Sequence, residues 1–478
     1  MDFWDEATIA AISTPLGEGG IGIIRISGSN AIAVADKMVI LARGGKVADL
    51  PSRRIANGFV VDDDGRKVDE VLVVVMRAPK SYTGEDVVEI HCHGGIVAMR
   101  KTLRLALKNG ARAAAPGEFT KRAFVNGRLD LAQAEAVAGI IGAKTEAALR
   151  AAAGQLEGRL SKLIREERDR LLKIIAAVEA AIDFPEEGLE EITAPEIASE
   201  LKSISDNLSQ MLNWASRGKI LREGLATAIV GRPNVGKSSL LNWLAGAEKA
   251  IVTEEPGTTR DVVEEWVNVE GIPLKIMDTA GIRDARDKAE KIGVERAKAV
   301  MGSADLVLLV IDGSEKLQEE DKGLIRDALR RTSLIAVNKK DLGIKVTLDD
   351  AAAAVAQEEL AAADLSKIKA ELEEKMIFLS AATGEGVNEL ERRIAALALA
   401  GTIVPGESAI MVSSRQEALA LKAKDCVEQA CRGFGQGVSL DCLAVDLREA
   451  WEALGHIVGE SVSDEIVDEI FSRFCIGK

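Results

Sequence analysis

The chain has 478 residues, of which 47% are hydrophobic and 3% aromatic, and its formal net charge is -15 at pH 7. This length predicts about three domains, and the acidic balance argues against a broadly basic nucleic-acid surface, although it leaves room for a local basic patch. Five cysteines without a paired framework, an N-terminus unlike a signal peptide and no apolar run of transmembrane length predict a cytoplasmic chain with no membrane partner.

Residues 1–125 mix short strands with glycine-rich turns. The apolar runs Ile21–Ile26 and Val71–Met76 predict strands, and Asp62–Gly65 predicts the turn of a hairpin. The pattern therefore predicts an α+β domain in this region.

His91, Cys92 and His93 admit a metal site or a structural strand end. On a strand the two histidines share one face and the cysteine lies on the other. A zinc site needs four ligands, and no matching Cys/His pair lies nearby. The structural or ligand-facing strand end is favoured.

Residues 126–221 have the composition of long helices. No proline occurs between Pro116 and Pro185, and Ala, Leu, Glu and Arg dominate. A further helix is predicted over Ala194–Trp214. This is the first part of a predicted helical domain.

Residues 222–398 alternate strands with helices, which predicts a mostly parallel sheet. Residues 399–478 are helical again, with a predicted break at Gly433–Gly437 and an amphipathic helix at Asp464–Phe471. The Ala- and Glu-rich tract Asp349–Glu374 predicts surface helix. Together these patterns predict an α/β domain inserted into a helical one.

A phosphate-binding loop follows the predicted buried strand Leu225–Val230. Gly231–Ser238 matches this motif, and Lys237 begins a helix whose N-terminus favours anions. Lys237 would reach the β- and γ-phosphates, and the Ser238 hydroxyl would bind Mg²⁺. The predicted nucleotide contacts of this loop are Asn234, Val235, Gly236, Lys237, Ser238 and Ser239.

A second motif, Asp278–Gly281, follows the predicted strand Leu274–Met277. Its aspartate suits Mg²⁺, and Gly281 would let its N–H approach the γ-phosphate. Between the motifs, Thr258 and Thr259 are either loop hydroxyls that cap a turn or ligands, and Thr259 is the predicted second Mg²⁺ ligand. The predicted contacts of this motif are Asp278, Thr279, Ala280 and Gly281.

Two further motifs would recognise guanine. The predicted strand Leu334–Val337 leads into Asn338 and Lys339, and Asp341 would accept hydrogen bonds that adenine cannot donate. The residues Ser380, Ala381 and Ala382 follow the predicted strand Met376–Leu379 and would offer N–H groups to the guanine oxygen. The ordered set of motifs predicts a Ras-like GTP switch.

Ile282 stands where Ras-like switches carry the glutamine that orients the attacking water. Isoleucine cannot hold that water, so another side chain must do so. The downstream candidates are Arg283, Asp284, Arg286, Asp287 and Glu290, and the residues alone do not decide among them.

Cys475 lies just after the predicted terminal helix. Most such cysteines pack structurally, and a helix C-terminus disfavours a thiolate, although Lys478 opposes that effect.

Along its full length the chain resembles the bacterial tRNA-modification GTPase family MnmE, also called TrmE. The segments that carry the resemblance are Gly19–Gly22, Arg25–Gly28, Ser81–Asp86, His93–Gly95, Ala115–Phe119, Leu129–Glu135, the GTP motifs and the terminal Cys475–Lys478. Two departures are a longer stretch between Asp341 and Ser380 and Glu255 in place of a small or apolar residue.

The resemblance implies a K⁺-dependent GTPase that forms a homodimer. It implies a heterotetramer with the flavoprotein MnmG (GidA), which modifies carbon 5 of the wobble uridine of certain tRNAs. A 5-formyl- or 5,10-methylene-tetrahydrofolate would supply the one-carbon unit, and the N-terminal domain would bind it and dimerise.

The resemblance also implies roles for single residues. The positions that match the folate contacts are Arg25, Glu89, Arg128 and Lys478, and those that match the K⁺ contacts are Asn234, Thr253, Glu255 and Thr258. Glu290 matches the water-orienting residue and, with Asp278, is the predicted catalytic pair. Arg260 is expected to couple the GTP state to modification, and Cys475 is a further functional candidate.

Two alternatives remain at this point. One is an RNA-binding ribosome-assembly switch without modification chemistry, although no appended KH or second G domain follows residue 398. The other is a non-catalytic GTP sensor, which Ile282 suggests.

Overall fold

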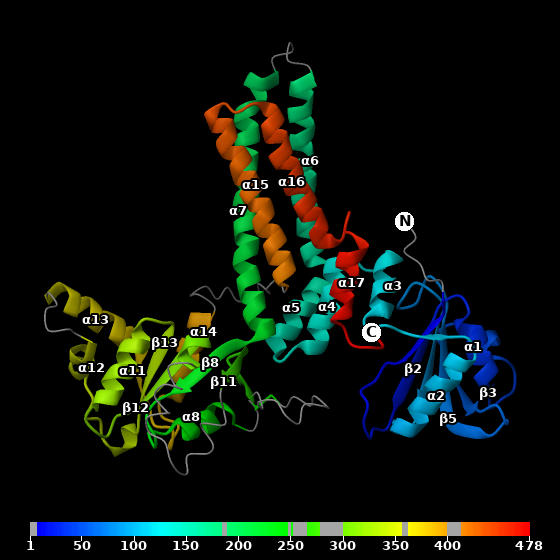
Figure 1. Ribbon diagram of the computed structural model, residues 1–478, viewed down its shortest axis with the longest axis horizontal. Helices are drawn as coiled ribbons and strands as arrows, with labels where there is room; N and C mark the ends of the chain where they lie inside the picture. Colours follow the sequence, from blue (N-terminus) through cyan, green and yellow to red (C-terminus); the bar gives the residue numbers. More distant parts are fainter. Residues whose placement is uncertain are drawn as a thin grey trace. The chain divides into compact units, whose positions relative to one another are not determined.

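The structure is a computed structural model, and it describes residues 7–183, 189–246, 250–251, 265–277, 300–355, 362–398 and 413–478 (Figure 1). The chain divides into two compact units. The first unit contains Met1–Ala138, Gln155–Leu208 and Ala418–Lys478, and the second contains Gly139–Gly154 and Ser209–Glu417. The four predicted domain ranges stay predictions.

A seven-stranded sheet in the order β3-β4-β5-β6-β2-β1-β7 forms the N-terminal part of the first unit. Its strands are β1 (Ile9–Ile12), β2 (Gly22–Ser27), β3 (Val39–Leu41), β4 (Ile55–Val61), β5 (Lys67–Met76), β6 (Val87–Cys92) and β7 (Arg112–Ala113). Helices α1 (Ala31–Met38) and α2 (Ile96–Lys108) share one hydrophobic core with alternate residues of these strands. The sheet confirms the predicted α+β character of this region.

The predicted hairpin turn is confirmed between β4 and β5. The Asp62 N–H donates to the Arg66 carbonyl oxygen at 2.9 Å, and the Gly65 N–H donates to the Asp62 carbonyl oxygen at the same distance. Gly65 has a φ of 76°, a left-handed conformation that favours glycine.

Helices make up the rest of the first unit and continue into the second. They are α3 (Glu118–Val125), α4 (Leu131–Gly142), α5 (Glu146–Leu156), α6 (Arg159–Asp183), α7 (Leu189–Glu223), α15 (Ser414–Gln436), α16 (Leu440–Val458) and α17 (Asp464–Ser472). Arg168 of α6 lies 4.0 Å from the ring centroid of Trp451 of α16 and donates to its carbonyl oxygen. This contact fixes α6 against α16.

The predicted helix break at Gly433–Gly437 is wrong at its start, because α15 continues to Gln436. The chain turns only at Gly437, whose φ is 70°. A Cβ atom on Gly433 would lie 2.4 Å from Leu443 Cδ2. Gly433 therefore serves close packing between α15 and α16 and does not end the helix.

The second unit contains a seven-stranded sheet in the order β14-β13-β12-β8-β11-β10-β9. Its strands are β8 (Leu225–Val230), β9 (Ala250–Ile251), β10 (Glu265–Val269), β11 (Ile272–Met277), β12 (Leu306–Asp312), β13 (Ser333–Asn338) and β14 (Met376–Phe378). The five strands from β14 to β11 are parallel, and β10 and β9 add an antiparallel edge. The predicted mostly parallel sheet is confirmed.

Helices pack on both faces of this sheet. They are α8 (Lys237–Leu244), α11 (Glu319–Leu329), α12 (Leu348–Val355), α13 (Ala362–Lys375) and α14 (Val387–Ala398). One core joins α8 and α14 to Leu308 and Val310, and the other joins α11, α12 and α13 to Val307 and Leu309. Successive residues of β12 thus enter opposite cores, as a doubly wound fold requires.

The described parts of the Asp349–Glu374 tract are helical, as predicted, in α12 and α13, but they are not confined to the surface. Ala351, Ala352 and Leu372 are fully buried in the second of these cores. In the described part of the chain, no helix is long and apolar enough to span a bilayer.

Candidate functional site

The phosphate-loop motif forms a tight turn between β8 and α8. Gly231 has a φ of 149°, and a Cβ atom there would lie 2.2 Å from the Val310 carbonyl oxygen. Asn234 and Gly236 also have positive φ values, 62° and 102°. Glycine at positions 231 and 236 allows this tight backbone path, in which successive N–H groups can surround an anion.

Lys237 lies across this turn. Its Nζ donates to the Gly231 carbonyl oxygen at 2.7 Å and to the Arg232 carbonyl oxygen at 2.6 Å. Burial lowers the pKa of Lys237, and Glu320 partly opposes that effect. The ammonium group is held inside the loop, where phosphate oxygens of a nucleotide would meet it.

Helix α8 begins at Lys237, as predicted. Gly236 is its left-handed N-cap, and Leu240, Leu241 and Leu244 bury one face of the helix in the core. Ser238 and Ser239 lie in the first turn, near the positive end of the helix dipole.

Asn338 joins the phosphate loop to the predicted guanine loop. Its Nδ2 donates to the Val235 carbonyl oxygen at 2.8 Å, and its Oδ1 accepts from the Ala381 N–H at 2.8 Å. The Ser380 hydroxyl donates to Asp341 Oδ1 at 2.6 Å. Three motifs that are distant in sequence therefore meet at the carboxyl ends of β8, β13 and β14, where ligands of open α/β sheets bind.

Several predicted site residues lie outside the described residues. They are Thr253, Glu255, Thr258, Thr259, Arg260, Asp278, Thr279, Ala280, Gly281 and Glu290. The other downstream candidates, Arg283, Asp284, Arg286 and Asp287, lie there too. Asn234, Ser239 and Ala382 are described, and each occupies its predicted loop or helix turn.

Sequence reasoning missed an aromatic contact at the guanine loop. A Cβ atom on Gly384 would lie 2.1 Å from Trp243 Cζ2, and Gly384 has a φ of 84°. The indole of α8 therefore packs against the backbone of this loop. The glycine alone was a signal for a turn, but nothing in the sequence indicated its contact with Trp243.

Three of the predicted folate residues converge around Tyr82. Arg25 forms two bonds of 2.9 Å to Glu89 Oε1, through Nε and Nη2. The guanidinium carbons of Arg25 and Arg128 lie 5.3 and 5.0 Å from the Tyr82 ring centroid. The cluster combines cations, a carboxylate and an aromatic face in one place.

The C-terminal tail reaches the same cluster. The Gly477 carbonyl oxygen accepts from Ser13 Oγ at 3.0 Å and from Arg25 Nη1 at 3.3 Å. Lys478 is the next residue, and Cys475 is exposed. The exposure of Cys475 in this chain does not favour a role in core packing.

The two histidines of the His91–His93 segment each pair with a carboxylate. His91 Nε2 lies 3.4 Å from Glu89 Oε2, and His93 Nδ1 lies 2.6 Å from Asp69 Oδ1. Burial raises the pKa of Cys92 to about 11. No group of three or more potential metal ligands occurs among the described residues.

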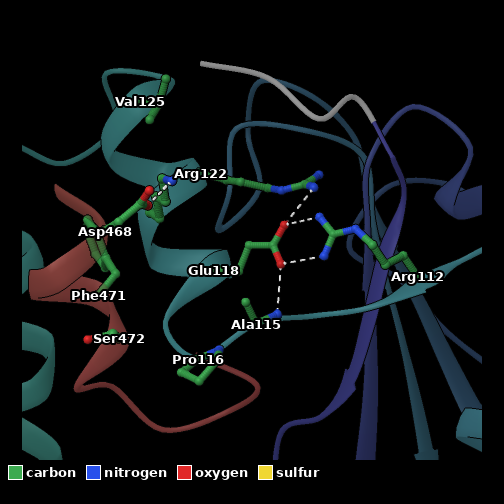
Figure 2. Close-up of a pocket in the computed structure, with 10 residues that line it drawn as sticks. Arg112, Ala115, Pro116, Glu118, Arg122, Val125, Asp468, Phe471 and Ser472 are labelled. Atoms are coloured by element: carbon green, nitrogen blue, oxygen red, sulfur yellow. Dashed lines mark hydrogen bonds and ion pairs between the residues drawn. The ribbon is translucent and has the colours of Figure 1, made fainter. Parts of the chain in front are cut away.

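A cavity of about 390 Å³ lies between α3 and α17 (Figure 2). Glu118 accepts from Arg112 at 2.7 Å and from Arg122 at 3.0 Å across one side of it. Burial alone would raise the pKa of Glu118, but the hydrogen bonds from Arg112 and Ala115 lower it overall. None of the predicted site residues lines this cavity.

Two family models match the chain. The model described as GTP-binding protein TrmE N-terminus matches residues 8–128, and the MnmE helical domain model matches residues 131–475. The tRNA modification GTPase MnmE of Geobacillus kaustophilus is 47% identical over 98% of this chain and 99% of that protein. The protein of the same name from Lactobacillus acidophilus is 46% identical over 98% of each.

Among solved structures, the G domain of the T. maritima FeoB iron transporter is 25% identical, with a TM-score of 0.25, over 36% of this chain and 98% of that one. The predicted resemblance is confirmed: the chain belongs to the MnmE family of tRNA modification GTPases.

Proposed function

We propose that this GTPase hydrolyses GTP in a K⁺-dependent reaction and takes part in modification of carbon 5 of the wobble uridine of certain tRNAs. The observation that supports the GTP part of this proposal is the double hydrogen bond of Asn338, which ties the phosphate loop to the guanine loop, and membership of the MnmE family supports the tRNA part. A site built in this way binds the two ends of one nucleotide at a fixed separation.

Guanine selectivity would come from Asp341. Ser380 already orients its carboxylate through a 2.6 Å hydrogen bond. A carboxylate in this position accepts hydrogen bonds from the N1 and N2 donors of guanine, whereas adenine leaves it unpaired. The predicted contacts Ala381 and Ala382 would add backbone N–H donors at the guanine oxygen.

The donor groups fit the expected cations. The Ser238 hydroxyl lies in the first turn of α8 and suits Mg²⁺. Asn234 is exposed in a left-handed conformation, and its amide oxygen suits K⁺. Mg²⁺ and K⁺ would stabilise negative charge on the phosphates, and the remaining proposed ligands are Thr259 for Mg²⁺ and Thr253, Glu255 and Thr258 for K⁺.

The residues around Tyr82 fit a folate. Arg25 and Arg128 offer guanidinium groups for a dicarboxylate tail, and Glu89 offers a carboxylate for the donor edge of a pterin. A tetrahydrofolate bound there would supply the one-carbon unit. We place Lys478 in this site because Gly477 already bonds to Arg25.

The proposed assembly is a homodimer that joins the flavoprotein MnmG, with tRNA as the substrate. Arg260 is the proposed link between the GTP state and the modification step, and the exposed Cys475 is a further functional candidate. We assign Glu290, with Asp278, to the catalytic step of GTP hydrolysis.

The test is steady-state GTP hydrolysis in matched KCl and NaCl, with the molecular mass in solution measured in each salt. Fast turnover only in KCl, on a dimer, is the expected result. Equal rates in the two salts would remove K⁺ from the mechanism while leaving the GTPase assignment intact. A modification assay with tRNA, the flavoprotein and a tetrahydrofolate then tests the second half of the proposal.

A further inference from the structure

Two carboxylates near the junction of β12 and α11 each hold a residue from a different nucleotide motif. Asp312 is the last residue of β12, and Asp321 lies in the first turn of α11. Asp312 Oδ2 accepts from Lys339 Nζ at 2.6 Å, and Asp321 Oδ1 accepts from Arg232 Nε at 2.8 Å. The two carboxylate side chains are only 7% and 2% exposed, so both contacts are shielded from solvent.

The Asp321 contact acts at the phosphate end. Arg232 is the second residue of the phosphate loop, and its carbonyl oxygen accepts from Lys237 Nζ at 2.6 Å. Its guanidinium group is fixed by Asp321, whose other oxygen accepts from the Gln318 N–H at 3.0 Å and caps α11. Helix α11 thus holds the residue against which the phosphate-binding lysine rests.

The Asp312 contact acts at the base end. Lys339 has a φ of 64°, a left-handed backbone conformation that is strained for a residue with a long side chain. Burial alone would raise the pKa of Asp312, but the hydrogen bonds from Lys339 and Ser314 outweigh it and lower the pKa. Asp312 is therefore a charged partner that holds Lys339, the residue directly after Asn338.

We propose that residues 312–321 form a buttress that positions both ends of the nucleotide site, Asp321 through the phosphate loop and Asp312 through Lys339. This inference rests on the proposed GTP function and adds two positioning residues to it. A purely structural role for the two ion pairs is the competing explanation, and it predicts loss of stability while the folded variants keep the wild-type affinities for both nucleotides.

The affinities of the full-length chain for GDP and GMP separate these explanations. GMP lacks the β-phosphate that Lys237 would reach, so the ratio of the two affinities reports on the phosphate end. Isothermal titration calorimetry measures both, and circular dichroism with thermal denaturation reports folding of each variant. The variants are Asp321→Asn, Arg232→Gln, their combination and Asp312→Asn.

The matched control is Glu319→Gln, which removes a carboxylate from the same helix turn. Glu319 is 84% exposed and pairs with Lys322 at 2.6 Å. Its loss should leave both affinities at the wild-type value.

For the phosphate end, Asp321→Asn and Arg232→Gln should each weaken GDP binding about tenfold, the factor that corresponds to about 1.4 kcal/mol. The affinity for GMP should change less, so the ratio of the GDP affinity to the GMP affinity should fall. The combined variant should be no worse than either single one, because both changes break the same contact. For the base end, Asp312→Asn should weaken GDP and GMP by the same factor and leave their ratio unchanged.

The role of Asp321 is overturned if folded Asp321→Asn and Arg232→Gln proteins keep the wild-type affinity ratio within twofold. The role of Asp312 is overturned if folded Asp312→Asn protein binds GDP and GMP with wild-type affinity. If Asp321→Asn fails to fold, Arg232→Gln decides the question alone, because Arg232 caps no helix. A wild-type chain that binds neither nucleotide would refute the proposed function itself. If the wild-type chain binds both nucleotides and the variants bind them with the same affinities, only the positioning role of Asp312 and Asp321 is refuted.

Discussion

Replacing Asn338 with alanine tests the central contact of the nucleotide site. Asn338 is 3% exposed, and the substitution removes the hydrogen-bond partners of the Val235 carbonyl and the Ala381 N–H. Each buried group left unpaired costs about 1–3 kcal/mol, so the pair costs about 2–6 kcal/mol. If the two loops separate in the unbound Asn338→Ala protein, nucleotide binding must bring them together again at this cost. Even the lower value then corresponds to roughly 30-fold weaker nucleotide binding.

The assay is calorimetric titration of the Asn338→Ala chain with GDP, alongside thermal denaturation. The control is Asn268→Ala, which removes a single 3.0 Å hydrogen bond to Gly271 in the β10–β11 turn of the same unit. The control should lose stability of about 1 kcal/mol and retain GDP affinity. GDP binding of Asn338→Ala within threefold of wild type would show that the bridge does not organise the site.

Gly384→Ala should weaken GDP binding and change the emission of Trp243, because the new Cβ atom would lie 2.1 Å from the indole; unchanged tryptophan fluorescence would contradict the packing. Glu290→Ala should retain GTP affinity and lose hydrolysis, measured by phosphate release, and normal turnover would exclude Glu290 from the mechanism. The Cys92 thiol has a pKa raised by burial from 9.0 to about 11, so unfolding by denaturant should become easier as pH rises through that window. The expected loss is about 2–3 kcal/mol, and Cys92→Ser should flatten this pH dependence.

The sequence predicted the parallel sheet of the second unit well because its signals are local. Leu225–Val230 is a continuous apolar run that ends at a glycine, and it is β8 with the predicted bounds. The phosphate loop and the start of α8 follow from the same few residues. Local steric and burial preferences decide these features, and one chain segment contains them all.

Contacts between distant segments were not predictable from such patterns. Arg232 and Asp321 are separated by 89 positions, and only the register of β12 beside β8 brings their segments together. Gly433 shows the same limit, since its neighbour Leu443 decides whether the glycine ends or permits a helix.

A helix was predicted over Ala194–Trp214, whereas α7 spans Leu189–Glu223, and its Leu221 is buried in the core of the second unit. Tertiary packing extended that helix beyond what composition indicated.

The strained backbone positions also show that contacts outside the motifs hold the nucleotide site. Among the described residues, the non-glycine residues with positive φ are Arg53, Asn234, Glu270, Lys339 and Ser461. Asn234 and Lys339 belong to nucleotide motifs, and such conformations cost of order 1–3 kcal/mol each unless the surroundings hold them. Lys339 has that support in its 2.6 Å contact with Asp312. The site therefore depends on packing partners outside the motifs, which is why a motif alone predicts where a nucleotide binds but not what holds the residues that bind it.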